Sequence, residues 1–332
     1  MKNNIPKLIT VCVTIASCIL ASCDTCTNHN PMHVTYADIN IISSDGNGHR
    51  VILGERSYYA NLLPTKYGIL YANNNFSLYS MNYDGSNQSR LFSNIPWGDR
   101  YFSPDESKLI LASDWLENNQ YQNNLFLMNP DGSDLVPLSP QKGQYLYPHI
   151  SPHLDEIVFI RDGGVATINI DGTNLQTIRV KTDSTRCMYT LYVDQDRILY
   201  FEQASATASI RLFDKLTRRD KVIGTSAGGF PGYGRILVNG NLLFSDALMI
   251  KVLDIDAATI STLVQGYYPS YSSDGSRIVY VKGSSMYMMD AHGGNQQTMY
   301  TEQASTKSIG FPLFSADDKN IIFTTSYTEV AP

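Results

Sequence analysis

The sequence is short of charge and of cysteine, and each shortage excludes a class of protein. Charged residues make up 17% of the 332 residues, and the net charge of −6 includes no basic stripe, so we expect no nucleic-acid partner. The five cysteines include no CxxC pair with a matching second pair, so we expect no zinc site, and nothing in the sequence calls for another cofactor. The longest apolar run lies near the N-terminus and is shorter than the roughly 20 residues that a transmembrane helix needs.

That run belongs to a segment with the pattern of an export signal. Lys2 and Lys7 form a basic start, and the apolar stretch 8–21 follows and ends in small residues. The sequence LASC, which ends at Cys23, resembles the lipobox of bacterial lipoproteins. The resemblance implies that residues 1–22 are removed as a lipoprotein signal peptide and that Cys23 carries the lipid. A second match, IASC ending at Cys18, and an ordinary secreted protein remain alternatives.

Residues 23–35 are expected to form the lipidated cysteine and a flexible polar tether. Cys12 and Cys18 leave with the signal, so only Cys26 and Cys187 remain as thiols. An oxidising envelope permits a bridge between them, but Cys26 lies in the tether and Cys187 in a stretch that reads as a polar loop. We therefore expect two unpaired cysteines.

The remaining chain is built from a repeat. A five-residue apolar pattern occurs seven times, at intervals typical of propeller blades: GILYA from Gly68, KLILA from Lys108, EIVFI from Glu156, RILYF from Arg197, NLLFS from Asn241, RIVYV from Arg277 and NIIFT from Asn320. Its apolar, β-branched and aromatic residues predict a buried strand, here called b. Turns such as SPDESK and a further strand, called a, precede most copies.

A second hairpin also recurs seven times, with strands called c and d. Asp-Gly follows strand c in four copies, at Asp45, Asp84, Asp131 and Asp171, which indicates a tight β-turn rather than a calcium loop. The chain begins with a c-d pair at 39–53 and ends with an a-b pair at 311–325. We therefore predict an all-β, seven-bladed propeller of four-stranded blades over residues 36–327, closed by the N-terminal c-d strands joining the C-terminal a-b strands.

Tyr147-Pro148, the following SP turn and the LFLMNPDGS segment resemble the WD-repeat-like units of TolB-type propellers, and similar units occur in the propeller of prolyl oligopeptidases. The resemblance covers residues 36–326 and implies the fold rather than an activity. TolB itself has an α/β domain before its propeller. The roughly 12 residues between Cys23 and the first strand leave no room for one, so a TolB role is not implied.

Catalytic patterns are weak. Gly224–Gly228 spells GxSxG around Ser226, but Gly-rich sequence follows instead of a helix, so we interpret it as a loop. His149, with His153, is the only histidine pair expected near the axis, whereas a catalytic metal usually takes three protein ligands, so no metal site is expected. Candidate glycosidase carboxylates are Asp99, Asp114, Asp162, Glu202 and Asp246.

Two further clusters have structural interpretations. The basic residues Arg211, Lys215, Arg218, Arg219 and Lys221 are expected to form a solvated edge. Met286, Met288 and Met289 alternate within a strand and are expected to pack inside a blade.

The expected function is a non-catalytic binding module, a monomer anchored to the cell envelope by its N-terminal lipid, at the outer membrane on its periplasmic or surface side. Its partner would be an envelope protein, a peptide or a glycan; the alternative is a propeller enzyme acting on oligosaccharides, a lyase or a glycosidase. We expect the ligand on the face formed by d-to-a and b-to-c loops, where aromatic and basic residues gather. The candidates are Trp97, Arg100, Tyr101, Trp115, Tyr147, His149, Arg161, Tyr233, Tyr267, Tyr268 and Lys282, with the connection 113–123 as a contact loop.

Overall fold

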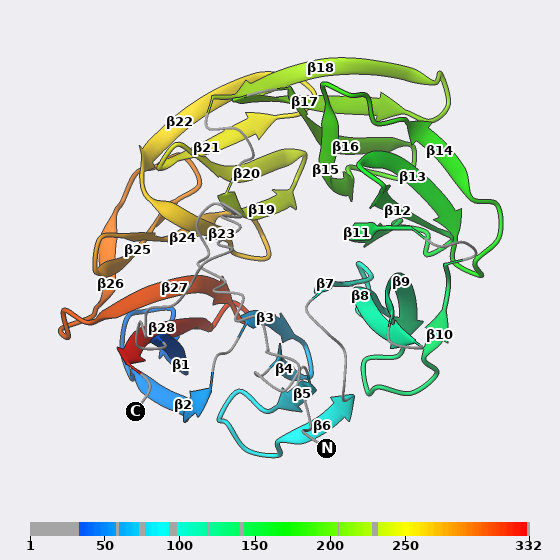
Figure 1. The fold of residues 1–332 in the computed structure, drawn as a ribbon. Coiled ribbons are helices and arrows are strands. Elements are labelled where there is room, and N and C mark those ends of the chain that lie inside the picture. The colour runs from blue at the N-terminus through cyan, green and yellow to red at the C-terminus, as the bar shows by residue number, and fades with distance from the viewer. Residues whose placement is uncertain are drawn as a thin grey trace, which may run out of the picture.

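The computed structural model describes residues 33–57, 60–72, 77–92, 98–117, 120–139, 143–204, 206–227 and 232–330. Their strands form seven four-stranded antiparallel sheets that follow one another as blades round a central axis (Figure 1). The predicted seven-bladed all-β propeller is thereby confirmed. The described residues include no helix, and so none that is long and apolar enough to cross a membrane.

Each blade has strands a to d from the axis outward. Blade 1 contains β3 (Ala60–Thr65), β4 (Gly68–Ala72), β5 (Leu78–Met81) and β6 (Ser89–Phe92). Blade 2 contains β7 (Gly98–Phe102), β8 (Leu109–Glu117), β9 (Gln120–Met128) and β10 (Val136–Pro137). Blade 3 contains β11 (Tyr145–Ile150), β12 (Glu156–Arg161), β13 (Gly164–Asn169) and β14 (Gln176–Arg179). Blade 4 contains β15 (Arg186–Tyr192), β16 (Arg197–Ala204), β17 (Thr207–Asp214) and β18 (Arg219–Ser226).

Blade 5 contains β19 (Gly232–Val238), β20 (Asn241–Asp246), β21 (Met249–Asp254) and β22 (Thr259–Gln265). Blade 6 contains β23 (Tyr267–Tyr271), β24 (Arg277–Lys282), β25 (Ser285–Asp290) and β26 (Gln297–Thr301). Blade 7 contains β27 (Lys307–Phe314), β28 (Asn320–Val330), β1 (His33–Ser43) and β2 (Arg50–Ser57).

Blade 7 closes the ring in the predicted way, because it joins the two ends of the described chain. Its strand order is β2-β1-β28-β27, so strands drawn in blue and in red share one sheet (Figure 1). The β1–β28 ladder pairs every residue from His33↔Val330 to Ser43↔Asn320. Between these strands the buried Asn40 Nδ2 donates to Thr325 Oγ1 at 3.0 Å.

The apolar five-residue repeats are the b strands, and they are buried almost throughout. Both faces of a b strand pack against neighbouring blades, which is why these strands are continuous apolar runs rather than alternating ones. The outer d strands are mostly exposed and more polar. Met286, Met288 and Met289 are buried in β25, which confirms their packing role.

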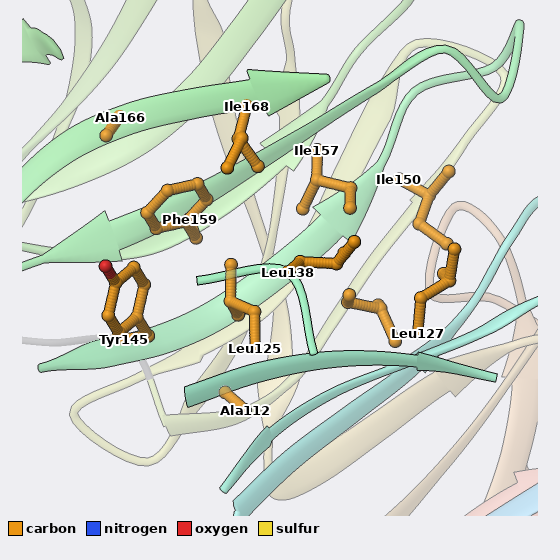
Figure 2. Packing of buried hydrophobic residues seen from close by; sticks show 11 residues of the cluster. Ala112, Leu125, Leu127, Leu138, Tyr145, Ile150, Ile157, Phe159, Ala166 and Ile168 are labelled. Atoms are coloured by element: carbon orange, nitrogen blue, oxygen red, sulfur yellow. The ribbon is translucent and has the colours of Figure 1, made fainter. Parts of the chain in front are cut away.

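The core consists of seven clusters, and each joins two neighbouring blades. Figure 2 shows the cluster between blades 2 and 3, where Leu125, Leu127 and Leu138 of blade 2 pack against Ile157 and Phe159 of blade 3. A single blade therefore has no core of its own. The stability of the ring comes from contacts between blades.

The ring has two different faces. Strands b and d lead to the loop face, which is formed by the b-to-c and d-to-a connections. The a-to-b and c-to-d connections form the opposite turn face. The four predicted Asp-Gly turns lie there, and their glycines have φ between 83° and 88°, a region that a side chain would disfavour.

Blade 2 departs from the others at the loop face. The segment 113–123, expected to be a loop, is a two-stranded ribbon in which β8 and β9 pair out to Glu117↔Gln120. Strand β7 pairs with β8 only as far as Ser113, and β10 is only two residues long. The ribbon therefore extends beyond both flanking strands. The expectation of a loop was wrong because the pairing of β8 and β9 continues past Ser113 as far as Glu117 and Gln120.

Candidate functional site

The residues predicted to bind a ligand are distributed over four blades. Trp97 lies outside the described residues. For Arg100 in β7, Trp115 in β8 and Tyr233 in β19, the structure describes the backbone only. The others are placed with their side chains: Tyr101 in β7, Tyr147 and His149 in β11, Arg161 in β12, Tyr267 and Tyr268 in β23, and Lys282 in β24.

These residues lie at different positions along the propeller axis, between the loop face and the turn face. Arg161 and Lys282 end b strands at the loop face, in blades that are not neighbours. Tyr101 and His149 stand one residue before the ends of their a strands, close to the turn face. Their rings, 6.3 Å apart between centroids, are close to each other but not to the loop face.

Four inner strands share an unusual aromatic residue. Tyr147, Tyr189, Tyr268 and Phe311 have φ between 49° and 56°, a conformation that is rare for bulky side chains. Each sits at a β-bulge in strand a of blades 3, 4, 6 and 7. Such positive φ values cost about 1–3 kcal/mol each and persist only where the surroundings hold them.

The surroundings hold these bulges by hydrogen bonds and ring contacts across neighbouring blades. Thr190 Oγ1 donates to the Tyr147 carbonyl at 2.7 Å. The rings of Tyr147 and Tyr189 lie 4.2 Å apart, and those of Tyr268 and Phe311 lie 4.6 Å apart. Sequence analysis singled out Tyr147 and Tyr268 but missed Tyr189 and Phe311, although Phe311-Pro312 repeats the Tyr-Pro pattern of Tyr147-Pro148.

His149 is held as a neutral ring inside the propeller. Its Nδ1 faces the backbone N–H of Tyr192, which donates to it at 3.3 Å, and the rings of Tyr101 and Tyr192 lie on either side. Burial lowers the pKa of His149 to about 4. An acceptor role at Nδ1 requires the unprotonated ring, so geometry and burial favour the same state.

This burial predicts a pH-dependent stability. Between about pH 6.5 and 4 an unfolded His149 takes up a proton that the folded ring does not, so the folded state loses stability as the pH falls through this window. Because the side chain keeps some exposure, we expect a loss of about 2 kcal/mol, less than the full shift would give. His149→Asn keeps an acceptor but does not titrate, and urea unfolding at pH 7 and pH 4.5 compares the two proteins. Equal losses in both proteins would show that His149 does not carry the effect.

A network of ion pairs runs along blade 4 from Glu202 near the loop face to Asp220 near the turn face. Glu202 is 7% exposed, and its two oxygens accept from Arg179 at 2.6 Å and from Arg211 at 3.2 Å. Asp220 accepts from Arg211 at 3.1 Å and from the Tyr200 hydroxyl at 2.7 Å. Arg179 belongs to strand d of blade 3, so this network ties two blades together.

The network corrects the expectation of a solvated edge for Arg211 and Lys215, whereas Arg218, Arg219 and Lys221 are exposed as predicted. Arg211 is half-buried between Glu202 and Asp220, and the Lys215 ammonium bonds Glu156 of blade 3 at 2.5 Å. The sequence around Arg211 and Lys215 did not indicate these ion pairs, because the acidic partners come from other strands.

Cys187 lies beside the same network. It is buried in β15 opposite Glu202, which corrects its expected position in a polar loop. Burial, with the negative charge of Glu202, raises the pKa of its thiol to about 12. Cys187 is a free cysteine. Cys26 lies outside the described residues, so the expectation that it is also unpaired stays a prediction.

Blade 5 has a smaller counterpart at the same height. Asp246 is buried, accepts from Lys251 at 2.6 Å and accepts from Ser226 Oγ at 2.8 Å. Ser226 is the serine of the GxSxG sequence, and it ends strand β18 instead of a strand-to-helix elbow. Its hydroxyl is engaged by a carboxylate, which is a packing role.

The described carboxylates that were considered for glycosidase chemistry already have hydrogen-bond or ion-pair partners within the protein. Glu202 and Asp246 are paired with cations, and Asp162 accepts from the Gln144 N–H at 2.9 Å. The side chains of Asp99 and Asp114 lie outside those described. Within the described part of the chain, no group of three His, Cys, Asp or Glu side chains could hold a metal ion.

The two faces differ in charge. The turn-face connections contain fourteen acidic residues: Asp45, Asp84, Asp105, Glu106, Asp131, Asp134, Asp155, Asp171, Asp194, Asp196, Asp256, Asp274, Asp317 and Asp318. They contain five basic ones: Lys66, Lys108, Lys215, Arg218 and Lys319. The loop-face connections contain only Asp162, Asp183 and Glu302 against Lys142 and Lys181. The turn face is therefore strongly acidic, and the loop face is close to neutral.

Hydrogen bonds also close the turn face from blade to blade. The Lys66 N–H donates to Glu106 at 2.9 Å, Gln195 to Asp155 at 3.0 Å and Asn239 to the Asp274 carbonyl at 3.1 Å. Within the turns, the Ser103 hydroxyl lowers the pKa of Asp105 to about 2. The loop face also has bonds between blades, from Arg179 to Glu202 and from Ser226 to Asp246. It has in addition an open hollow of roughly 370 Å³ between blades 3 and 4, lined by residues 181–186 and Gln203.

Solved structures share this fold at low sequence identity. A puromycin-hydrolysing peptidase of Mycobacterium tuberculosis is 16% identical with a TM-score of 0.57, over 76% of this chain and 46% of that one. A chain of a nidogen/laminin complex is 10% identical with a TM-score of 0.52, over 80% of this chain and 97% of that one. A putative TolB of Agrobacterium tumefaciens is 13% identical with a TM-score of 0.48, over 90% of this chain and 99% of that one.

This chain spans less than half the length of the peptidase, and at these identities the likeness concerns the fold alone. No family model and no curated protein matches the sequence. In fold, the chain is a seven-bladed β-propeller.

Proposed function

We propose that this chain is a lipid-anchored envelope protein whose propeller binds a protein, peptide or glycan partner at its loop face without catalysing a reaction. The lipid is attached at Cys23, in the lipobox-like sequence that ends the export signal. The candidate contacts at that face are the β8–β9 ribbon with Trp115 and the strand ends with Arg161 and Lys282.

The difference between the two faces carries the proposal. The turn-face connections are mostly short acidic turns, whereas the loop face is close to neutral and has a projecting ribbon and an open hollow. Loops and extensions on a rigid scaffold are common positions for binding residues. The cations bound to Glu202 and Asp246 support a binding role over glycosidase chemistry, because both carboxylates already stabilise the fold.

Trp115→Ala tests the loop face directly. We expect it to weaken partner binding by about 2–4 kcal/mol, since tryptophans at interface centres are frequent hot spots, and to leave the melting temperature nearly unchanged. Tyr67→Ala on the turn face, where Tyr67 is 69% exposed, is the matched control. The partner is first captured from the native envelope with the wild-type protein, and its affinity for each variant is then measured.

Two results would contradict the proposal. Equal binding by wild-type and Trp115→Ala, with loss only in Tyr67→Ala, would move the site to the turn face. Turnover by the purified protein on uronate or neutral oligosaccharides would show an enzyme. Tyr268 is the poorer test, because its ring packs on Phe311 and its removal also lowers stability.

A further inference from the structure

Both ends of the described chain lie at the loop face. Strand β1 is a c strand and therefore starts there, at His33, and β28 is a b strand and ends there, at Val330. The β1–β28 ladder continues beyond Ala37, where the pairing with β2 ends. A second two-stranded extension thus rises from the loop face, with the Tyr36 and Tyr327 rings 5.6 Å apart near its base.

The tether to Cys23 could reach round a blade to the turn face only if it were almost fully extended. Residues 24–32 separate Cys23 from His33, and such a segment spans about 30–35 Å when fully extended and about 15–18 Å on average when flexible. A six-residue strand such as β24 is itself about 20 Å long, and the strands of a blade are about 4.8 Å apart. If the turn face lay on the membrane, the tether would have to pass outward over strand d and then run along the whole length of the blade to the turn face.

Charge favours the same orientation. The turn-face connections contain fourteen acidic residues against five basic ones, whereas the loop face is nearly balanced. Anionic lipid headgroups repel an acidic surface over roughly a Debye length. The electrostatic repulsion from an anionic lipid surface is therefore weaker for the loop face than for the turn face.

The ribbon of blade 2 adds suitable residues at this face. It extends past Ser113 and carries Trp115, Leu116 and Tyr121 within nine residues of sequence. Tryptophan and tyrosine are enriched at membrane interfaces, where an apolar ring and a polar group meet their preferred surroundings together.

We propose that the loop face lies against the lipid surface that holds Cys23, with the β8–β9 ribbon at headgroup level and the acidic turn face pointing away. The proposal rests on the lipid attachment in the proposed function. It narrows the partner of that function to a group presented at the lipid surface. The occupant of the face in the absence of a partner is the bilayer itself.

Fluorescence quenching by nitroxide-labelled lipid tests this orientation. The lipidated protein carries Cys26→Ser and one introduced cysteine, either Ser284→Cys on the loop face or Ala257→Cys on the turn face, both exposed positions. Cys187 is buried and stays unlabelled. In vesicles of phosphatidylcholine and phosphatidylglycerol at 3:1, we expect a fluorophore at Ser284→Cys to be quenched at least threefold more than one at Ala257→Cys.

The outcomes separate the orientation from the anchor. Equal quenching at both positions, or stronger quenching at Ala257→Cys, in protein that floats with the vesicles overturns the orientation and leaves the anchor intact. Cys23→Ala is expected to abolish flotation. If the wild-type protein does not float, or Cys23→Ala floats equally well, the anchor at Cys23 fails and the orientation fails with it.

Discussion

Deleting residues 36–53 is expected to prevent the whole propeller from folding, not only blade 7. The deletion removes most of β1 and half of β2, so β28 loses its partner along most of the ladder that closes the ring. It also removes Ala37, Ile39, Ile41 and Leu53 from the cluster between blades 7 and 1, where all four are buried. Each large apolar side chain contributes about 1.5–3 kcal/mol when buried, so the loss approaches the 5–15 kcal/mol that a domain typically has.

Circular dichroism and thermal unfolding of the deletion variant test this expectation, with a variant lacking residues 1–32 as the control. We expect the control to melt like the mature protein and the deletion variant to show no cooperative transition. A synthetic peptide of residues 33–57 added to the deletion variant is expected to restore the transition. A deletion variant that melts like the full protein would contradict the closure of the ring by β1 and β28.

Glu202→Gln is expected to destabilise the protein by about 3 kcal/mol. The substitution keeps the shape of the side chain but leaves Arg179 and Arg211 without their shared carboxylate in a place that is largely closed to water. Removing one partner of a buried ion pair costs about 3–5 kcal/mol, and the partial exposure of Arg179 reduces this cost.

Asp256→Asn is the matched control for this substitution. Asp256 also pairs with an arginine of a neighbouring blade, Arg197, but it is 73% exposed, and exposed ion pairs contribute at most about 1 kcal/mol. Urea unfolding at pH 7 compares the two variants. Equal losses of stability would show that the Glu202 network acts as a surface ion pair and does not tie blades 3 and 4 together.

The fold could be predicted from the sequence because its signal repeats. Seven apolar runs with turn residues before them predicted the b strands, and six of the seven begin at the predicted residue, the exception being β8 at Leu109. The closing blade followed from the order of hairpins at the two chain ends. Local patterns are sufficient here because each blade uses the same arrangement of strands and turns.

The site was less predictable because its contacts join strands from different blades. Arg211 and Glu202 lie on adjacent strands, but Arg179 comes from the blade before, and no local spacing indicates that the three meet. The ribbon at 113–124 was also missed, since a polar segment such as ENNQYQNN has the composition of a loop although its backbone continues the b and c strands. The heights of Tyr101 and His149 depend on register, which the repeat pattern does not specify.

The closing ladder also determines when folding can finish. Asn40 and Thr325 bond each other across 285 positions of sequence, and the two strands that contain them belong to opposite ends of the chain. The hairpin of β1 and β2, which is synthesised first, must therefore wait with one strand edge uncovered until the hairpin of β27 and β28 has left the ribosome. Contacts of such long sequence separation slow folding and leave the intermediate open to aggregation. The chain is thus most vulnerable to aggregation between the synthesis of β1 and the formation of β28.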